Sequence, residues 1–305
     1  MALFIDPPVW PAHGTRFSHL ISDGSLRELR LFAREAGVPD RAFDLDHYDV
    51  PATRYGTLVA AGAAPVAGGD LARRLAGSGL RVSGAERSRA KRAALLARWD
   101  DLWADPGPAR TTGEDLVDRW REPHRVYHSP LHLAVALDGL DAIAAGTPAS
   151  AHALRQARLA LWFHDAVHEG VAQQDEERSA ALATELLGPL TSAGAEVAVE
   201  DVDEVARLVM VTAAHEPTPD DVTGALVSDA DLAVLGGRPA VYTRYTRQVR
   251  AEYCDVPDVP FRAGRAQVLR ALLGGGPLFR TAPGTARWQS TATANLRTEL
   301  TALTA

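Results

Sequence analysis

The sequence predicts an α+β chain of two domains, in which a small α/β domain over residues 1–83 precedes an all-α domain over residues 86–305. In the first part, short apolar runs alternate with helical patterns, which favours a small layer of strands and helices. The turn-rich segment AGSGLRVSGAE follows and marks the boundary near residues 77–85. Beyond Glu86 no strand alternation is visible, and helical patterns follow one another with short Gly, Pro or Thr breaks.

The predicted α/β domain begins with a short buried strand, ALFI, which ends at Asp6 and two prolines. A helix follows, because Ser25 and Glu28 form a capping box, the apolar residues share one face and Gly37 stands where a helix would end. The other elements expected here are a strand at residues 42–45, a helix led by Pro51, a short APV strand at residues 64–66 and a helix over residues 70–77.

The all-α domain is expected to hold about ten helices, separated by short breaks. One of them opens with a capping box formed by Thr111 and Glu114. The helical patterns cover residues 86–104, 111–120, 131–146, 153–167, 175–188, 204–215, 225–236, 241–253, 262–274 and 286–303.

Composition excludes several classes of protein. With 46% hydrophobic and 23% charged residues, the chain of 305 residues can bury a large core and is unlike a disordered protein. It has no run of about 18 apolar residues, and its start lacks the pattern of a secretory signal, so we expect a cytoplasmic protein outside membranes. A net charge of −7 argues against broad nucleic-acid binding, and the single Cys254 leaves metal binding to His and carboxylates.

Histidines concentrate in the predicted all-α domain, where seven of the ten lie within residues 124–215. His128 and His132 are four residues apart, a spacing that places both side chains on one helix face. His164 and His168 have the same spacing. Because a His on an apolar helix is commonly a hydrogen-bonded core residue, these pairs indicate a site only in combination with other groups.

The His164-Asp165 doublet directly follows the apolar run of residues 159–163. An ionised Asp at the end of a buried run is costly unless a cation or a hydrogen-bonding partner lies beside it. We therefore expect a positive charge there, which is either a metal ion or the Arg partner of an ordinary core carboxylate. The other alternative is a helix that ends at Phe163 and leaves Asp165 in solvent.

A third element, LVSDADLAVLGG, sets two more carboxylates, Asp229 and Asp231, in an apolar segment. Residues two apart on a helix face nearly opposite ways, so at most one points into a given site and the other is a cap or an exposed acid. One His of YHSPLH, the doublet and one of these acids would supply two imidazoles and two carboxylates. That donor set suits Mn²⁺, Fe²⁺, Co²⁺, Ni²⁺, Zn²⁺ or Mg²⁺, with positions left for water and substrate.

The order of these residues resembles the H…HD…D signature of the HD-domain superfamily, an all-α fold of metal-dependent phosphohydrolases. From about Glu86 to the C-terminus, YHSPLHLAVAL, LWFHDAVHEG, EERSA, DADLAVLG, YTRYTRQVRAEY and ARWQSTATANLRTEL are similar to a bacterial subgroup of predicted phosphohydrolases. The resemblance implies an HD-type helical domain that binds a divalent ion. The implied metal ligands are His132, His164, Asp165 and Asp231, with Asp229 as the alternative last ligand.

HSPLH and HDAVH also resemble the HNxxH and HDxxH arrangements of cyclic-nucleotide phosphodiesterases. This likeness implies that His128 gives a proton to the leaving oxygen and that His168 is a partner on the phosphate side. Apart from this likeness, Asp165 or Asp231 would orient the attacking water as well as bind the ion. The plainer alternative for His128 is a residue at a helix start.

Some HD proteins hold two metal ions through extra histidines, and His168 with His215 would supply them here. Alternatively, His215 marks a helix end before Pro217, where a cationic ring interacts well with the helix dipole. We favour one ion over two.

Hydrolysis of a phosphoester or phosphoanhydride bond, in a nucleotide or another small phosphorylated molecule, is therefore the leading expectation. Arg178 in EERSA and Arg247, in a series with Arg244 and Arg250, would bind phosphate, although such a series is commonly a solvated helix face. Two alternatives stay open: a di-iron oxygenase on the HD fold, and a non-catalytic protein that senses a nucleotide or binds a partner.

The N-terminal segments FIDPPVWPAHG, FSHLISD and DLDHYDVP resemble DUF4031, a small bacterial family of unknown function, over about residues 2–83. They place polar residues in loops beside strand ends, where α/β proteins usually build sites. No spacing among them defines a chemistry, so we assign this domain no activity. The residues are Asp6, His13, His19, Asp23, Asp46, His47 and Asp49.

Overall fold

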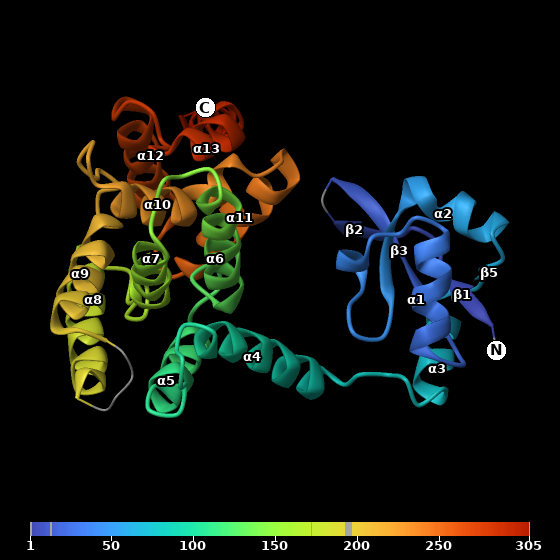
Figure 1. The fold of residues 1–305 in the computed structure, drawn as a ribbon. Helices are drawn as coiled ribbons and strands as arrows, with labels where there is room; N and C mark the ends of the chain where they lie inside the picture. The colour runs from blue at the N-terminus through green and yellow to red at the C-terminus, as the bar shows by residue number, and fades with distance from the viewer. Residues whose placement is uncertain (1, 13, 172, 193–196, 305) are drawn as a thin grey trace. The chain divides into compact units, whose positions relative to one another are not determined.

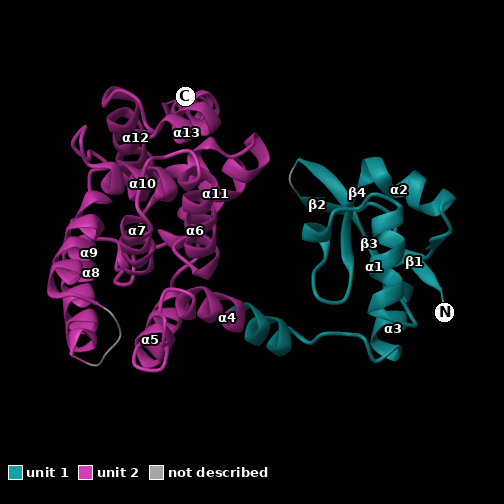
Figure 2. Ribbon diagram, viewed as in Figure 1, with its two compact units in different colours: residues 1–91 teal, residues 92–305 magenta. Residues whose placement is uncertain are grey.

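The computed structural model describes residues 2–12, 14–171, 173–192 and 197–304 of the chain. It forms two compact units, residues 1–91 and 92–305, and the division lies within helix α4 (Gly84–Asp100) (Figures 1 and 2). All named strands belong to the first unit and the named elements of the second are helical, so the predicted order of an α/β part and a helical part is confirmed. None of the described helices is long and apolar enough to cross a membrane.

The first unit is built on a five-stranded sheet. Its strands are β1 (Leu3–Ile5), β2 (Trp10–Ala12), β3 (Thr15–Ser22), β4 (Tyr48–Pro51) and β5 (Ala64–Pro65). Its helical elements are α1 (Leu26–Glu35), the 3₁₀ turn η1 (Asp40–Ala42), α2 (Ala52–Ala60) and α3 (Gly68–Gly77). The long strand β3 pairs antiparallel with β1, β2 and β4, and β5 pairs parallel with β1.

Both faces of this sheet are covered, because alternate residues of a strand point to opposite faces. Ile5 and Leu20 pack in the cluster that includes residues of α1 and α2. Phe4 and Ile21, their neighbours in the strands, pack instead against Leu71 of α3 and nearby residues. The result is a small three-layer arrangement that fixes the strand ends from both sides.

The predicted strand ALFI, the short strand at residue 64 and the helices α1, α2 and α3 are confirmed. The strand predicted at residues 42–45 is wrong, because the chain turns there with Leu45 in the left-handed region at a φ of 61°, and the strand begins at Tyr48. The hairpin formed by β2 and β3 was not predicted. Its turn contains Gly14, whose φ of 75° is unstrained only for glycine.

The second unit consists of helices and short helical turns. They are α5 (Arg110–Trp120), α6 (Pro130–Ala144), α7 (Ala151–Phe163), α8 (Gln174–Leu187), η2 (Gly188–Thr191), α9 (Val199–Val211), α10 (Val222–Asp231), η3 (Leu232–Gly236), α11 (Pro239–Glu252), α12 (Asp258–Gly274), α13 (Ala282–Gly284), the π-helical turn η4 (Thr285–Gln289) and α14 (Ser290–Thr304), together with most of α4. Each helical pattern predicted from the sequence has a counterpart among them.

Several helices end earlier than their sequence patterns predict. Among them, α7 ends at Phe163, α9 ends at Val211 and α10 ends at Asp231. After α7 and α10, buried apolar residues continue past the helix end, and a periodicity of 3.6 residues does not reveal where the helix stops. The early ends matter, because His164, Asp165 and Asp231 lie at two of them.

A large aromatic core supports these helix ends. Trp99, Trp120, Trp162 and Phe163 are fully buried in it. The indole N–H of Trp120 donates to the carbonyl of Trp162 at 3.0 Å, which ties α5 to the last turn of α7. The His164 ring, directly after that turn, lies 5.3 Å from the Trp120 ring.

The close approach of α4 and α5 predicts that Gly113→Ala is destabilising. A Cβ at residue 113 would lie 2.6 Å from Nε1 of Trp99, which is buried and cannot move away. We expect a loss of about 1–3 kcal/mol in the free energy of unfolding, the usual cost of overpacking a core.

The control is Gly264→Ala in α12, where no atom lies within 4 Å of the added Cβ. This variant should gain about 0.5–1 kcal/mol. Urea denaturation measures both, and equal stabilities would contradict the packing.

The ion pair between Asp221 and Arg207 should make a pH-dependent contribution to the free energy of unfolding. Burial raises the pKa of Asp221, but hydrogen bonds from Arg207 and from the N–H of Gly224 outweigh burial and hold the pKa below its usual value. Asp221→Asn keeps a good N-cap of α10 and removes only the charge. We expect wild type to be more stable by about 0.5–1 kcal/mol at neutral pH.

That stability difference should be complete above about pH 5 and should vanish as the pH falls through the lowered pKa of the folded state. Urea denaturation at a series of pH values measures it. The neighbouring exposed Asp220→Asn is the control, and it should show no such dependence. A difference that stays constant down to low pH would contradict the ion pair.

Candidate metal centre

Four side chains from three helices bring their polar atoms to one point. His132 lies in the first turns of α6, His164 and Asp165 directly follow α7, and Asp231 is the last residue of α10. His132 Nε2 lies 3.1 Å from His164 Nε2 and 3.1 Å from Asp231 Oδ1. His164 Nε2 lies 3.0 Å from Asp165 Oδ2 and 3.4 Å from Asp231 Oδ1, and His132 Nε2 lies 3.5 Å from Asp165 Oδ2. The structure thus brings together the four predicted ligands.

These distances fit a shared metal ion. Ligands bound at about 2.0–2.2 Å lie roughly 2.8–3.6 Å from one another in octahedral or tetrahedral geometry. All five distances given above fall in that interval. Both imidazoles are nearly fully buried, whereas Asp165 and Asp231 are 16% and 15% exposed. Access from solvent therefore lies on the carboxylate side.

The chemistry of the four groups also requires a positive charge among them. The His164 Nδ1–H donates to the carbonyl of Leu161 at 2.8 Å, so a neutral His164 presents a lone pair at Nε2. Burial lowers the pKa of His164, but Asp165 and Asp231 overcome it and raise that pKa well above its usual value. Burial raises the pKa of Asp165, but His164 and His128 bring it well below its usual range. Either protons or a divalent ion can supply that charge.

Arg125 fixes the backbone beside the doublet, and sequence reasoning missed it. Its fully buried guanidinium donates to the carbonyl oxygens of Asp165 at 2.5 Å and Ala166 at 3.1 Å. It also donates to the carbonyl of His128 at 3.4 Å. An Arg partner near the doublet was an alternative to a metal ion, but Arg125 binds the main chain and not the Asp165 carboxylate. A single Arg in a loop carries no pattern that would have identified it.

Glu252 joins His128 to His168, and it was also missed. Its Oε1 accepts from His128 Nδ1 at 2.5 Å and from His168 Nε2 at 3.2 Å, and the two rings stack at 3.9 Å. Its Oε2 accepts the backbone N–H groups of Val126, Tyr127 and His128. An acidic residue ending a helix opposes the helix dipole, and that unfavourable placement was the available signal.

His128 faces the metal centre through its other nitrogen. His128 lies two residues before α6 begins, and its Nε2 is 4.0 Å from Asp165 Oδ2. Burial lowers the pKa of His128, while the charges of Asp165 and Glu252 act against that shift. His128, Asp165 and His168 thus form a second group of donors beside the first.

Of the two acids considered as the last ligand, Asp231 lies with the other three side chains and the alternative, Asp229, points elsewhere. The Asp229 carboxylate is fully buried and accepts from the N–H groups of Arg280 and Thr281 at 2.7 and 2.8 Å, and from the Thr281 hydroxyl at 2.7 Å. It fastens the segment before α13 to α10. The expectation that the other acid is a helix cap or an exposed acid is wrong, because Asp229 lies buried inside α10 and Thr281 caps α13.

His215 lies on another side of the centre. Its Nε2 is 3.5 Å from Asp231 Oδ2 and its Nδ1 is 3.2 Å from the Ser228 hydroxyl. It stands four residues beyond the end of α9, with a φ of 55°. Since His168 contacts Glu252 and His128 instead, the two predicted extra ligands do not share one neighbourhood.

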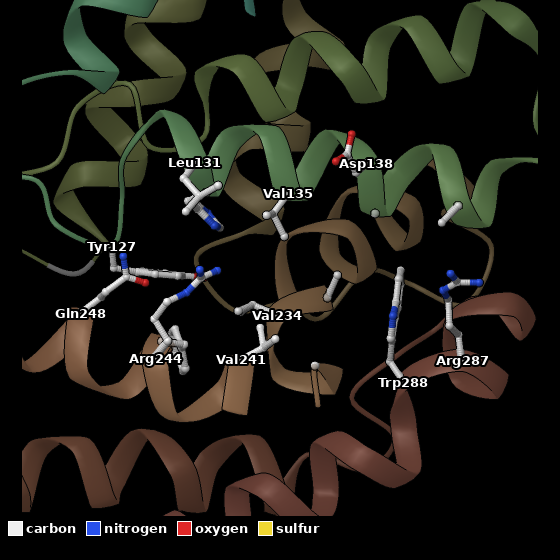
Figure 3. Close-up of a pocket in the computed structure, with 16 residues that line it drawn as sticks. Tyr127, Leu131, Val135, Asp138, Val234, Val241, Arg244, Gln248, Arg287 and Trp288 are labelled. Carbon is white, nitrogen blue, oxygen red and sulfur yellow. The ribbon is translucent and has the colours of Figure 1, made fainter. Parts of the chain in front are cut away.

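A cavity of about 260 Å³ opens beside His132 (Figure 3). Val135 and Val241 line its middle, Arg244 extends from α11 toward α6, and Arg287 lies with Trp288 at the other end. The two predicted phosphate ligands are not among its lining residues. Arg247 is exposed on α11, and Arg178 is exposed and paired with Glu169 at 2.7 Å. The arginines that line this cavity are Arg244 and Arg287.

Comparison with known proteins identifies a family only in the first unit. Residues 3–78 match the model of a protein family of unknown function, DUF4031. Neither the curated proteins nor the solved structures gave a match to the chain. The HD-type likeness of the helical unit stays a prediction from its residues.

The different surroundings of Asp231 and Asp229 predict opposite effects of the same substitution. Asp231→Asn removes a ligand at the open side of the centre, and we expect the bound metal to be lost with little change in folding. Asp229→Asn places an amide N–H against two backbone N–H groups and should cost about 1–3 kcal/mol while metal binding is retained. Elemental analysis of purified protein and urea denaturation measure the two effects. Metal loss in the Asp229 variant alone would contradict the assignment.

Proposed function

We propose that the helical unit is a metal-dependent phosphohydrolase of the HD type, which acts on a nucleotide or another small phosphorylated molecule. The observation that carries the proposal is the convergence of His132, His164, Asp165 and Asp231 at metal-ligand distances. These four residues would hold a divalent ion, Mn, Fe, Co, Ni, Zn or Mg. Such an ion, when bound, acidifies water and polarises a phosphoryl oxygen.

The cavity that His132 lines would receive part of a phosphorylated substrate, although Asp165, Asp231 and His128 are not among its lining residues. Arg244 and Arg287 offer guanidinium groups that bind phosphate oxygens in bidentate fashion. Val135, Val241 and Trp288 form an apolar wall against which the rest of a small organic molecule can pack. Its volume of about 260 Å³ limits the bound part of the substrate to a small group.

His128 is the residue that would protonate the leaving oxygen. In its protonated form the ring donates Nδ1–H to Glu252 and keeps an Nε2–H on the side of Asp165, where the reacting phosphate would lie. The Glu252 carboxylate stabilises the imidazolium and fixes its orientation. General-acid help of this kind contributes about 10²- to 10⁴-fold in rate. His168 shares the same carboxylate oxygen and so acts as a positioning residue.

A di-iron oxygenase is the second candidate, and one observation favours it. Asp165 belongs to both donor groups, because its Oδ2 lies 3.0 Å from His164 Nε2 and 4.0 Å from His128 Nε2. A carboxylate in that position can bridge two ions. One observation argues against a second ion: His128 Nδ1 and His168 Nε2 are already hydrogen-bonded to Glu252. Two iron ions per chain with oxygen consumption would support this candidate.

Metal-loaded wild type should hydrolyse at least one member of a broad panel of phosphoesters and nucleotides. His164→Ala and Asp165→Ala should reduce that rate by at least about 10³-fold, because each removes a metal ligand. Released phosphate measured over time checks this expectation. His152→Ala, an exposed imidazole elsewhere in the unit, is the control and should keep full activity.

Activity that survives in both ligand variants would exclude the proposed centre. A wild type that hydrolyses nothing but binds a nucleotide stoichiometrically would favour the non-catalytic sensing protein.

The cavity predicts that Arg244→Ala weakens substrate binding. Removing one guanidinium from a phosphate contact should raise KM about 10-fold or more, since hydrogen bonds to charged groups contribute roughly 1.5–3 kcal/mol. Arg247→Ala, on the same helix but outside the cavity lining, should leave KM unchanged. Steady-state kinetics on the best substrate of the panel measure both. An equal effect of the two variants would place the phosphate elsewhere.

A further inference from the structure

The first unit contains a second group of convergent donors. Its centre is a row of residues across three neighbouring strands, in which His19 of β3 lies directly opposite Asp49 of β4. Asp6 follows the last residue of β1, and its N–H donates to the carbonyl of His19 at 3.2 Å. His47 completes the group from the position before β4. His13, also singled out in the sequence, lies outside the described residues.

A buried carboxylate orients the His19 ring. Asp6 is 1% exposed and accepts from the Trp10 indole N–H at 2.9 Å and from the His19 N–H at 2.5 Å. The carboxylate also accepts from His19 Nδ1, at 3.1 Å. The neutral ring therefore presents a lone pair at Nε2.

His47 is held in the same way by a different carboxylate. Asp46 is fully buried and accepts from His47 Nδ1 at 2.6 Å, from the Val82 N–H at 2.7 Å and from Arg87. A carboxylate behind each imidazole is the arrangement that fixes the tautomer of metal-binding histidines. Both His47 and His19 have it, although they come from different strands.

The two rings meet at Asp49. Its Oδ1 lies 3.4 Å from His47 Nε2 and 3.7 Å from His19 Nε2, and the ring centroids are 5.1 Å apart. All three atoms are acceptors when the rings are neutral, so they repel one another unless a cation lies between them. The distances are close to the roughly 2.8–3.6 Å between ligands that share one ion.

We propose that His19, His47 and Asp49 bind a divalent transition-metal ion in the first unit. Two imidazoles and one carboxylate suit Zn²⁺, Co²⁺, Fe²⁺ or Ni²⁺ better than Ca²⁺ or Mg²⁺, which prefer oxygen ligands. Three protein ligands leave coordination positions open. Both histidines line a cavity of about 310 Å³ that Trp10 and Arg81 also line, so a water molecule or a small ligand can occupy those positions. This site is independent of the function proposed for the helical unit.

The test measures the metal content of the full-length chain after equilibration with Zn²⁺ and removal of free metal. Asp49→Asn and His47→Ala should each lower the content by one ion per chain relative to wild type. Asp70→Asn is the matched control, because Asp70 is a carboxylate of the same unit and similarly exposed, at 52% against 48% for Asp49. It should leave the content unchanged.

A second measurement identifies the ligands directly. Co²⁺-loaded wild type should show a ligand-field absorption band that is altered in His47→Ala and unchanged in Asp70→Asn. Because Asp49 is half exposed, Asp49→Asn should keep the fold, which circular dichroism verifies. Wild-type content in Asp49→Asn, or a wild type without an ion that depends on these residues, would overturn the proposal. Asp231→Asn reports on the helical unit separately, so failure at either site is recognisable.

Discussion

The organisation of the helical unit depends on acceptors that face one another across a gap of about 3 Å. Two imidazoles and two carboxylates at these distances need a positive charge among them, from protons or from a metal ion, and the fold holds them together. Helices α6, α7 and α10 bury large apolar side chains in one core, which Trp99, Trp120 and Trp162 share. The packing of that core fixes the positions of the four polar side chains.

Hydrogen bonds to the backbone complete that support. Arg125 holds the carbonyls after α7, and Glu252 holds the N–H groups before α6. Both side chains are charged and buried, and both satisfy main-chain groups of the loops beside these helices. The loop before α6 and the loop after α7 are thereby fixed to each other and to α11. A side chain on either loop has little freedom to move away from its neighbours.

The sequence predicted the helices and the four donors, because apolar periodicity and the His-Asp doublet are local signals. Prediction from sequence failed where a contact between residues distant in the chain determines the local structure or the position of a side chain. Residues 42–45 have the composition of a strand, but buried Asp46 and its bonds to Val82 and Arg87 impose a turn. The choice between Asp229 and Asp231 depends on Thr281, which is distant in sequence. Arg125 and Glu252 belong to no motif, and the convergence of His19 with His47 depends on strand register.

The attachment of Asp229 has a consequence for how this protein can diversify. The last turn of α10 carries Asp231, the proposed metal ligand, and through Asp229 it is fastened to the segment that leads into η4. Trp288 and Arg287 of η4 form one end of the cavity, and Trp288 packs against the backbone of Gly236 so closely that no Cβ fits there. That wall and the candidate centre are therefore fastened to each other. A lineage that enlarges the cavity without disturbing this attachment would do so at apolar lining residues such as Val135 and Val241.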